Sequence, residues 1–114
     1  MKLPNLQQAI ISRAKIVDYL LSLTHRDGRG KAEFFIRFGF SREDWEGLAM
    51  ALQDHAAANE VAKIETSPFG MRYIVEGAIV SPDGRNPDVR VVWFVETGEA
   101  APRLVTAYPL KELI

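Results

Sequence analysis

The period of the hydrophobic residues changes once along this chain, near Asn59, and this change limits the folds open to it. Before Asn59, apolar side chains recur every three or four residues, as in the stripe of Trp45, Leu48 and Leu52, which is typical of amphipathic helices. After Asn59, short runs of β-branched and aromatic residues are separated by turn-forming residues, which is typical of strands. Helices followed by strands, without alternation, predict an α+β fold with the helices on one face of an antiparallel sheet.

The helical half divides into three predicted helices. Ser12 and Ser41 can cap the first and third at their N-termini, and Gly39 suits the left-handed backbone that ends the second. The residues up to about Ile11 are predicted to form an extended lead that lies along the sheet. The predicted helices run from Arg13 to Ser22, from the turn at Gly30 to Phe38, and from Ser41 to about Asn59.

Four strands are predicted in the second half, joined by short connections that contain Pro and Gly. Connections of this kind join antiparallel neighbours. The third strand is apolar on both faces apart from Arg90, which favours a central position in the sheet. The predicted strands are Val61 to Ser67, Met71 to Ser81, Val89 to Thr97 and Arg103 to Tyr108. We therefore expect one domain, residues 1–114, with about three N-terminal helices packed on one face of a four-stranded antiparallel sheet.

The composition is that of an ordinary globular protein, with 47% hydrophobic and 25% charged residues. No apolar run approaches the roughly 18 residues that a membrane-spanning helix needs, and no secretory signal is expected at the start. The chain has no cysteine, so it can form neither a disulfide nor a thiolate zinc site. We expect a cytoplasmic protein that uses no cofactor and does not enter a membrane.

The net charge is −1, from 14 basic and 15 acidic residues. Proteins that bind nucleic acid usually have a basic excess, because neutralising phosphates supplies much of the affinity. Any contact with RNA must therefore come from a local patch of this chain.

His25 is the first candidate for chemistry, because it lies in the turn-forming segment from Thr24 to Gly30, beside cations such as Arg29 and Lys31. Neighbouring cations disfavour a charged imidazole, which suits a proton acceptor near neutral pH. The alternative is a solvated loop residue without a role. The other histidine, His55, lies among alanines on the third helix and is predicted to be an ordinary surface or boundary residue, so a metal site is not expected.

Two cations occupy positions where apolar residues are usual. Lys31 shares a helical stripe with Phe34 and Phe35, so its ammonium group either reaches out to solvent or is held over a surface that binds an anion such as phosphate. Arg90 lies on the predicted central strand. There it either pairs with a glutamate of a neighbouring strand, such as Glu76, or grips two phosphate oxygens at once.

The last predicted strand carries two hydroxyl groups, those of Thr106 and Tyr108. Side chains alternate along a strand, so both are predicted to share one face with Leu104. Their hydroxyls are suited to binding a phosphate or orienting a ribose. The alternative is that the strand contains them only because Thr and Tyr favour strands.

Over nearly its whole length the chain resembles a family of small bacterial domains without an assigned function. Members of that family occur as free-standing short proteins and as C-terminal domains of larger proteins, some of them toxin-like. The matching residues are Met1 to Asn5, then His25, Gly28, Lys31, Ala32 and Phe35, and finally Pro102 to Tyr108.

The layout is also similar to the barnase–EndoU–colicin–RelE group of metal-independent ribonuclease toxins. This resemblance implies an enzyme that cleaves RNA through its own 2′-hydroxyl, with no metal or cofactor, and a small cognate protein that neutralises it. Carried over by position, His25 would be the acid–base residue, and Lys31 and Arg90 would bind the phosphate. Thr106 and Tyr108 would complete the site.

The alternative function is a non-catalytic interaction module, one half of a bacterial two-protein pair of the toxin–antitoxin kind. The nearly neutral net charge favours it. The two functions predict different arrangements of the candidate site residues. A catalytic domain should gather His25, Lys31, Arg90 and Tyr108 in one cleft, whereas a binding module should scatter them.

Overall fold

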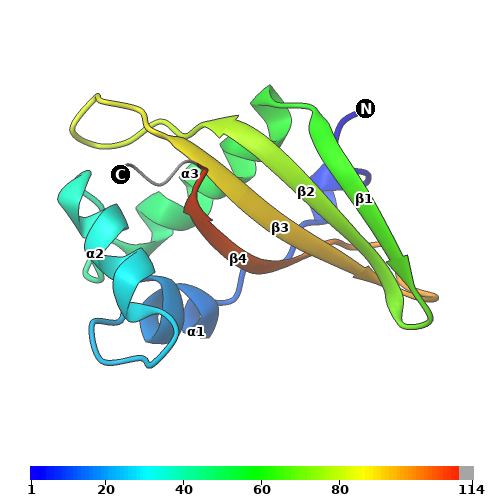
Figure 1. Ribbon diagram of the computed structural model, residues 1–114, viewed down its shortest axis with the longest axis horizontal. Coiled ribbons are helices and arrows are strands. Elements are labelled where there is room, and N and C mark those ends of the chain that lie inside the picture. Colours follow the sequence, from blue (N-terminus) through cyan, green and yellow to red (C-terminus); the bar gives the residue numbers. More distant parts are fainter. Residues whose placement is uncertain (111–114) are drawn as a thin grey trace.

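The computed structural model describes residues 1–110, in which the helical elements come first and the strands follow (Figure 1). The helical elements are the 3-10 turn η1 (Leu6–Gln8), the short helix α1 (Arg13–Lys15), the π-helical turn η2 (Ile16–Leu20), and the helices α2 (Arg29–Arg37) and α3 (Trp45–Ala58). The strands are β1 (Val61–Ser67), β2 (Gly70–Ala78), β3 (Asp88–Glu96) and β4 (Arg103–Pro109). The predicted α+β class is therefore confirmed.

The four strands form one antiparallel sheet in the order β1-β2-β3-β4. The strand β3 lies between β2 and β4, which confirms the central position predicted from its apolar residues. Val91 of β3, for example, pairs with Val75 on one side and with Ala107 on the other.

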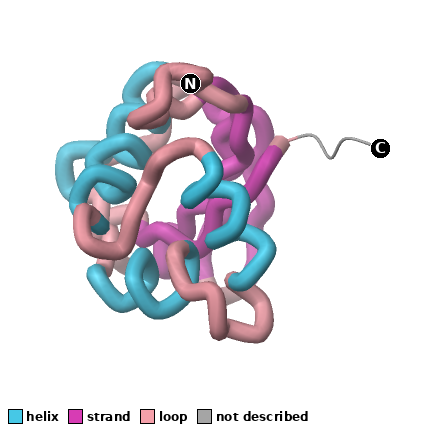
Figure 2. The backbone as a smooth tube through the Cα atoms, turned by 90° about the vertical axis from the view of Figure 1, so that its left-hand side faces the viewer, coloured by secondary structure: helices cyan, strands magenta, loops and turns pink. Residues whose placement is uncertain are grey.

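The hydrophobic core lies between the helices and one face of the sheet, and Figure 2 shows the helices gathered mostly to one side of the strands. Leu48 and Leu52 of α3 pack in this core with Val91 and Trp93 of β3, and all four are fully buried. Burial of side chains of this size contributes roughly 1.5–3 kcal/mol each. The opposite face of the sheet, which faces the viewer in Figure 1, has no helix lying across it among residues 1–110.

The first helix differs from its prediction. Ser12 caps it as expected, with its Oγ accepting a hydrogen bond from the amide of Lys15. Beyond Lys15 the backbone widens into the π-helical turn η2, so that the amide of Leu21 donates to the carbonyl of Ile16, five residues earlier, at 2.8 Å. Turns of this kind are rare and are frequent at functional sites.

The third helix begins later than predicted. Ser41 accepts a hydrogen bond from the amide of Asp44 at 3.2 Å, but this bond closes a turn before the helix, and Asp44 is the N-cap of α3. Gly39 has φ of 106°, the left-handed conformation that was predicted to follow the second helix.

The N-terminal lead contacts the sheet, but it is not extended throughout as predicted, because it turns at Asn5 and forms η1. The amide of Val61, at the start of β1, donates to the carbonyl of Met1. At the other edge, Ile10 forms a parallel bridge with Arg103, and its carbonyl accepts from the amide of Leu104. The lead therefore contacts both edge strands.

A bulge in β4 changes which side chains share a face. Val92 pairs with Thr106 and the next residue, Trp93, pairs with Leu104, so Val105 is an extra residue in β4. Leu104 is only 5% exposed and belongs to the core, whereas Thr106 pairs with Val92 on the opposite face. The prediction that Leu104 and Thr106 share a face is wrong because the alternation of side chains is interrupted between them.

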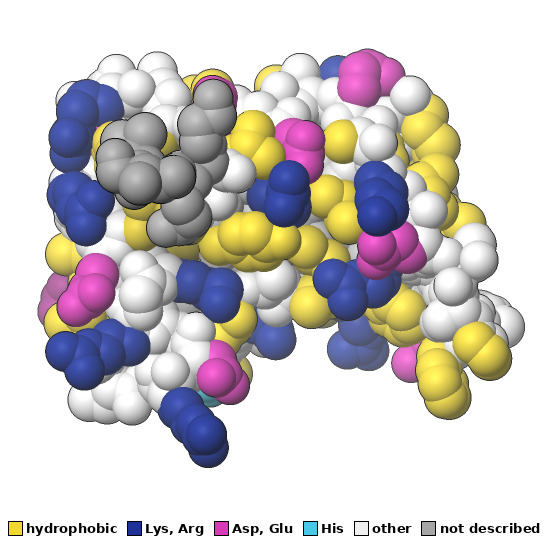
Figure 3. Space-filling view, in the orientation of Figure 1, with side chains coloured by type: hydrophobic (Ala, Val, Ile, Leu, Met, Phe, Trp, Pro, Cys, Tyr) yellow, Lys and Arg dark blue, Asp and Glu magenta, His cyan; other side chains and the backbone are white. Residues whose placement is uncertain are grey.

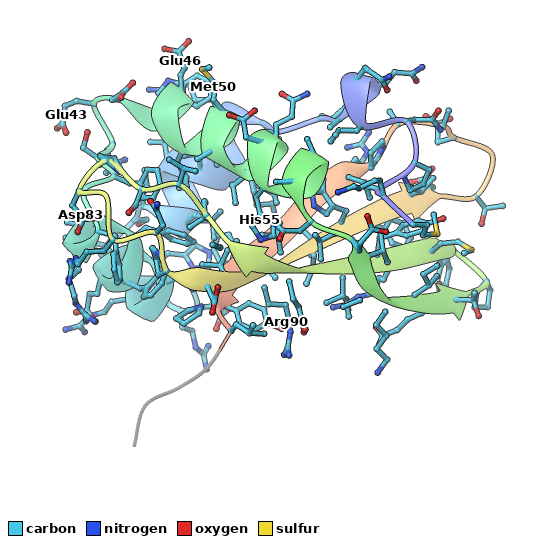
Figure 4. All side chains as sticks on the ribbon, turned by 90° about the horizontal axis from the view of Figure 1, so that it is seen from above. Glu43, Glu46, Met50, His55, Asp83 and Arg90 are labelled. Atoms are coloured by element: carbon cyan, nitrogen blue, oxygen red, sulfur yellow. The ribbon has the colours of Figure 1, made fainter. Side chains whose placement is uncertain are left out.

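His55 is buried, and the prediction of a surface or boundary position is wrong. It is 2% exposed and lies between α3 and the sheet, as Figure 4 shows. Its Nε2 lies 3.1 Å from the carbonyl oxygen of Gly77, and its Nδ1 has no hydrogen-bond partner within the described part of the chain. Small alanines beside it on α3 leave room for the ring against the sheet.

None of the helices within residues 1–110 has the length and apolar character needed to cross a membrane.

Candidate functional site

Two rows of side chains cross the open face of the sheet, opposite α3. Each row consists of cross-strand partners on β2, β3 and β4, which share a face because they are directly opposite one another. Figure 4 shows Arg90 on this side of the sheet. The first row is Glu76, Arg90 and Tyr108, and the second is Ile74, Val92 and Thr106.

Arg90 and Glu76 form the ion pair that the sequence suggested. Nε of Arg90 donates to Oε2 of Glu76 at 2.7 Å, and the two side chains are 35% and 31% exposed. The Tyr108 side chain and then the Glu76 carboxylate raise the pKa of Arg90, so the guanidinium stays charged. The Cζ atom of Arg90 also lies 5.8 Å from the centre of the Tyr108 ring.

Lys31 continues the first row beyond the edge of the sheet. It lies in the first turn of α2, where the helix dipole adds positive potential. Its Nζ lies 5.9 Å from the ring centre of Tyr108 and 5.4 Å from that of Tyr19, and it donates to the carbonyl of Asp27. Tyr108 therefore lies between two cations, one from the helix and one from the sheet.

Tyr19 continues the second row, and sequence reasoning missed it. Its hydroxyl lies 2.9 Å from Oγ1 of Thr106, and its ring lies 4.9 Å from the ring of His25 in an edge-on arrangement. Tyr19 is directed there by the π-helical turn η2, which nothing in the sequence marks. Gly28 lets the next loop approach closely, because a side chain at that position would overlap the carbonyl of Tyr19.

His25 caps the turn that leads into α2. Its Nδ1 lies 3.0 Å from the backbone nitrogens of both Asp27 and Gly28, and its carbonyl accepts from the amide of Arg29. A nitrogen that accepts two N–H groups is unprotonated, so the proton of the neutral ring is on Nε2. In this geometry the lone pair of Nδ1 is engaged by the cap.

Two hollows adjoin at Asp27, which lines both of them. The first is a cleft of about 770 Å³ whose lining includes Tyr19, His25 and Thr106. The second is a groove of about 500 Å³ whose lining includes Lys31 and Tyr108. The fold thus brings four of the five predicted site residues to adjoining hollows, and the fifth, Arg90, lies beside Tyr108.

The surroundings of these hollows are mixed in charge. Cations line the cleft at Lys15 and Arg72, and Arg72 lies 3.5 Å from Glu65. Figure 3 shows Lys and Arg side chains on both sides of a hydrophobic band on this face, with fewer carboxylates between them. Cations and carboxylates therefore alternate around the hollows, and Arg72 and Arg90 are each paired with a glutamate.

The fold and these two rows define an α+β domain with a cluster of aromatic, hydroxyl and cationic side chains on its uncovered sheet face. The chain belongs to the family described as Domain of unknown function (DUF6883), whose model matches residues 2–111. No curated protein matches the chain.

The fold is also similar to a chain in the contact-dependent growth inhibition toxin–immunity protein complex from Klebsiella pneumoniae 342. The TM-score is 0.73 at 19% sequence identity, and the alignment covers 94% of this chain and 97% of the other. At this identity the likeness shows a shared fold.

Proposed function

We propose that this chain is a toxin-type domain that cleaves RNA without a metal ion, by attack of the ribose 2′-hydroxyl on the adjacent phosphate. The observation that carries the proposal is the position of Tyr108 between Lys31 and Arg90, next to the hydrogen-bonded hydroxyls of Tyr19 and Thr106. Two cations and several hydroxyls at adjoining hollows fit a phosphate that gains negative charge during reaction.

The chemistry requires both charge stabilisation and proton transfer. The bond from the 2′ oxygen to phosphorus forms, the bond from phosphorus to the 5′ oxygen breaks, and the products end in a 2′,3′-cyclic phosphate and a 5′-hydroxyl. Lys31 and the guanidinium N–H groups of Arg90 that Glu76 does not use stabilise the charge on the phosphate. A general base takes the proton of the 2′-hydroxyl, and a water molecule from solvent protonates the departing 5′ oxygen.

In this proposal His25 positions the turn, and Asp27 takes the proton from the 2′-hydroxyl. The lone pair of Nδ1 is engaged by the cap, so His25 acts as a base only if the cap opens. Asp27 lies two residues further along the chain and lines both the cleft and the groove. Enzymes use aspartate carboxylates as general bases, and this one lies where the two hollows meet.

The proposal is tested by incubating the purified chain with total RNA in EDTA. The wild type should cleave the RNA, and Lys31→Ala should lower the rate by about a hundred-fold or more. Lys2→Ala is the matched control, since Lys2 carries the same charge at the other end of the molecule, where it pairs with Glu60. Absence of cleavage by the folded wild type, or equal rates for wild type and Lys31→Ala, would contradict the proposal.

The second candidate function is a non-catalytic interaction module. The specific observations in its favour are that Glu76 already neutralises Arg90 and that the cap engages His25. The structural neighbour comes from a toxin–immunity protein complex. We infer from this that a cognate partner protein binds the present chain, whichever function it has. A folded chain that binds such a partner but leaves RNA intact would favour the module.

A further inference from the structure

The groove between α2 and β4 has two aromatic walls. Phe34 projects from α2, and its ring is held 5.2 Å from that of Phe35 and 4.9 Å from that of Phe38. The facing wall is Tyr108, which is held between two cations. The groove volume of about 500 Å³ is within the range of about 300–1,000 Å³ that is usual for small-ligand sites.

Gly30 borders this groove without a side chain. Gly30 lines it from the first turn of α2, and a Cβ added there would meet no other atom within 4 Å. Neither packing nor a left-handed backbone requires glycine at this position, and glycine weakens a helix relative to alanine. The fold therefore leaves room at position 30 both for alanine and for a longer side chain that reaches into the groove.

Two cations border the aromatic walls. Lys31 and Arg37 both line the groove from α2. Neither forms an ion pair with a carboxylate of residues 1–110. Asp27 also lines the groove, but no ion pair joins it to either cation. Aromatic faces next to two cations suit a strand of nucleic acid, whose bases stack on the rings and whose phosphates lie near the cations.

We propose that this groove holds an unpaired nucleobase, so that the RNA which this chain recognises is single-stranded where the groove grips it. The inference rests on the proposed function and adds to it the class of RNA. A base inside a duplex has both faces covered by its neighbours, so it cannot stack between Phe34 and Tyr108 unless it first leaves the helix.

The test compares two substitutions at Gly30 in the full chain. Gly30→Gln fills the groove with an uncharged, helix-favouring side chain, and Gly30→Ala is the matched control that adds a single carbon. Binding is measured by fluorescence anisotropy in EDTA, with a short unstructured 2′-O-methyl RNA strand that 2′-hydroxyl attack cannot cleave. The same strand annealed to its complement is the duplex probe, and cleavage is followed separately with the unmodified strand.

The wild type should bind the single strand about ten-fold or more tightly than the duplex, and Gly30→Gln should lose about ten-fold or more of that affinity. Gly30→Ala should bind like the wild type, and both variants should unfold at the same or a higher denaturant concentration. If Gly30→Gln unfolds, Phe34→Leu, which keeps the groove apolar but removes the ring, should show the same loss of affinity.

Equal affinity for both probes, or full affinity in Gly30→Gln, overturns the proposed base site, and the proposed cleavage then still stands if the unmodified strand is cut. A wild type that neither binds nor cleaves overturns both proposals.

Discussion

The hydroxyl of Tyr19 lies 2.9 Å from Oγ1 of Thr106, and this hydrogen bond joins the π-helical turn η2 to the last strand across 87 residues of sequence. The ring of the same tyrosine contacts the ring of His25 in the loop before α2. One side chain therefore connects three segments that surround the cleft. The geometry of the candidate site depends on this contact as well as on the sheet.

Tyr19→Phe should lower the free energy of unfolding by about 0.5–1.5 kcal/mol, because the hydrogen bond is lost while the ring and its contacts remain. Thr106→Val removes the other hydroxyl and should cost a similar amount. The double variant should cost less than the sum of the two, since one bond is lost in each case. Urea unfolding of the four proteins measures this, and strictly additive effects would show that the two hydroxyls do not interact.

The two roles of His25 are separated by comparing His25→Asn with His25→Ala. Asn is a good capping residue and can accept the amides that Nδ1 accepts now, so His25→Asn should keep the turn and most of the RNA cleavage. His25→Ala should lose the cap and about 0.5–2 kcal/mol of stability. If His25 transfers a proton, the Asn variant should instead lose as much activity as the Ala variant. Initial cleavage rates of folded variants decide between these outcomes.

Leu48→Ala should destabilise the chain by about 2–5 kcal/mol, because Leu48 is fully buried between α3 and the sheet. Met50→Ala is the control on the same helix. Met50 is 66% exposed, so its truncation should change the stability by no more than about 0.5 kcal/mol. Denaturant unfolding of both variants checks the core, and a small effect of Leu48→Ala would show that α3 does not pack as described.

The stability of the chain should fall as the pH is lowered from neutral, in part because of His55. Burial lowers the pKa of His55 from its ordinary value of 6.5, against the opposing effects of the Gly77 and Val89 backbones and the Asp88 charge. Below that value the unfolded state binds a proton that the folded state does not, so the free energy of unfolding decreases as the pH falls. His55→Gln, which cannot titrate, should show a weaker pH dependence between neutral pH and about pH 5 in urea unfolding. Equal pH dependence in both proteins would contradict this account.

Sequence reasoning succeeded where a residue pattern and the packing agree. The strand from Val61 to Ser67 was predicted with its observed bounds, because a change of period and a Pro-Phe-Gly turn enclose it. The central strand followed from its apolar residues. The pair of Arg90 with Glu76 is one of the two alternatives that the sequence left open for this arginine.

The failures came from backbone irregularities that no composition rule marks. The π-helical turn directs the Tyr19 side chain towards Thr106. The bulge in β4 places the side chains of Leu104 and Thr106 on opposite faces of the sheet. The cap formed by His25 depends on the local backbone path of Asp27 and Gly28, which the residue types in this loop do not indicate. Irregular backbone of this kind decides most of the site, whereas periodic patterns decide the fold.

The central claim is cleavage of RNA through its own 2′-hydroxyl, and the most direct measurement is the chemistry of the product ends. A defined single-stranded RNA is digested with the purified chain in EDTA, the cut position is mapped, and the fragments are examined by mass spectrometry. We predict a 2′,3′-cyclic phosphate on one fragment and a 5′-hydroxyl on the other, with cleavage abolished when the nucleotide before the cut carries a 2′-deoxy sugar. Uncut RNA, or cleavage that persists on the 2′-deoxy strand, would contradict the account.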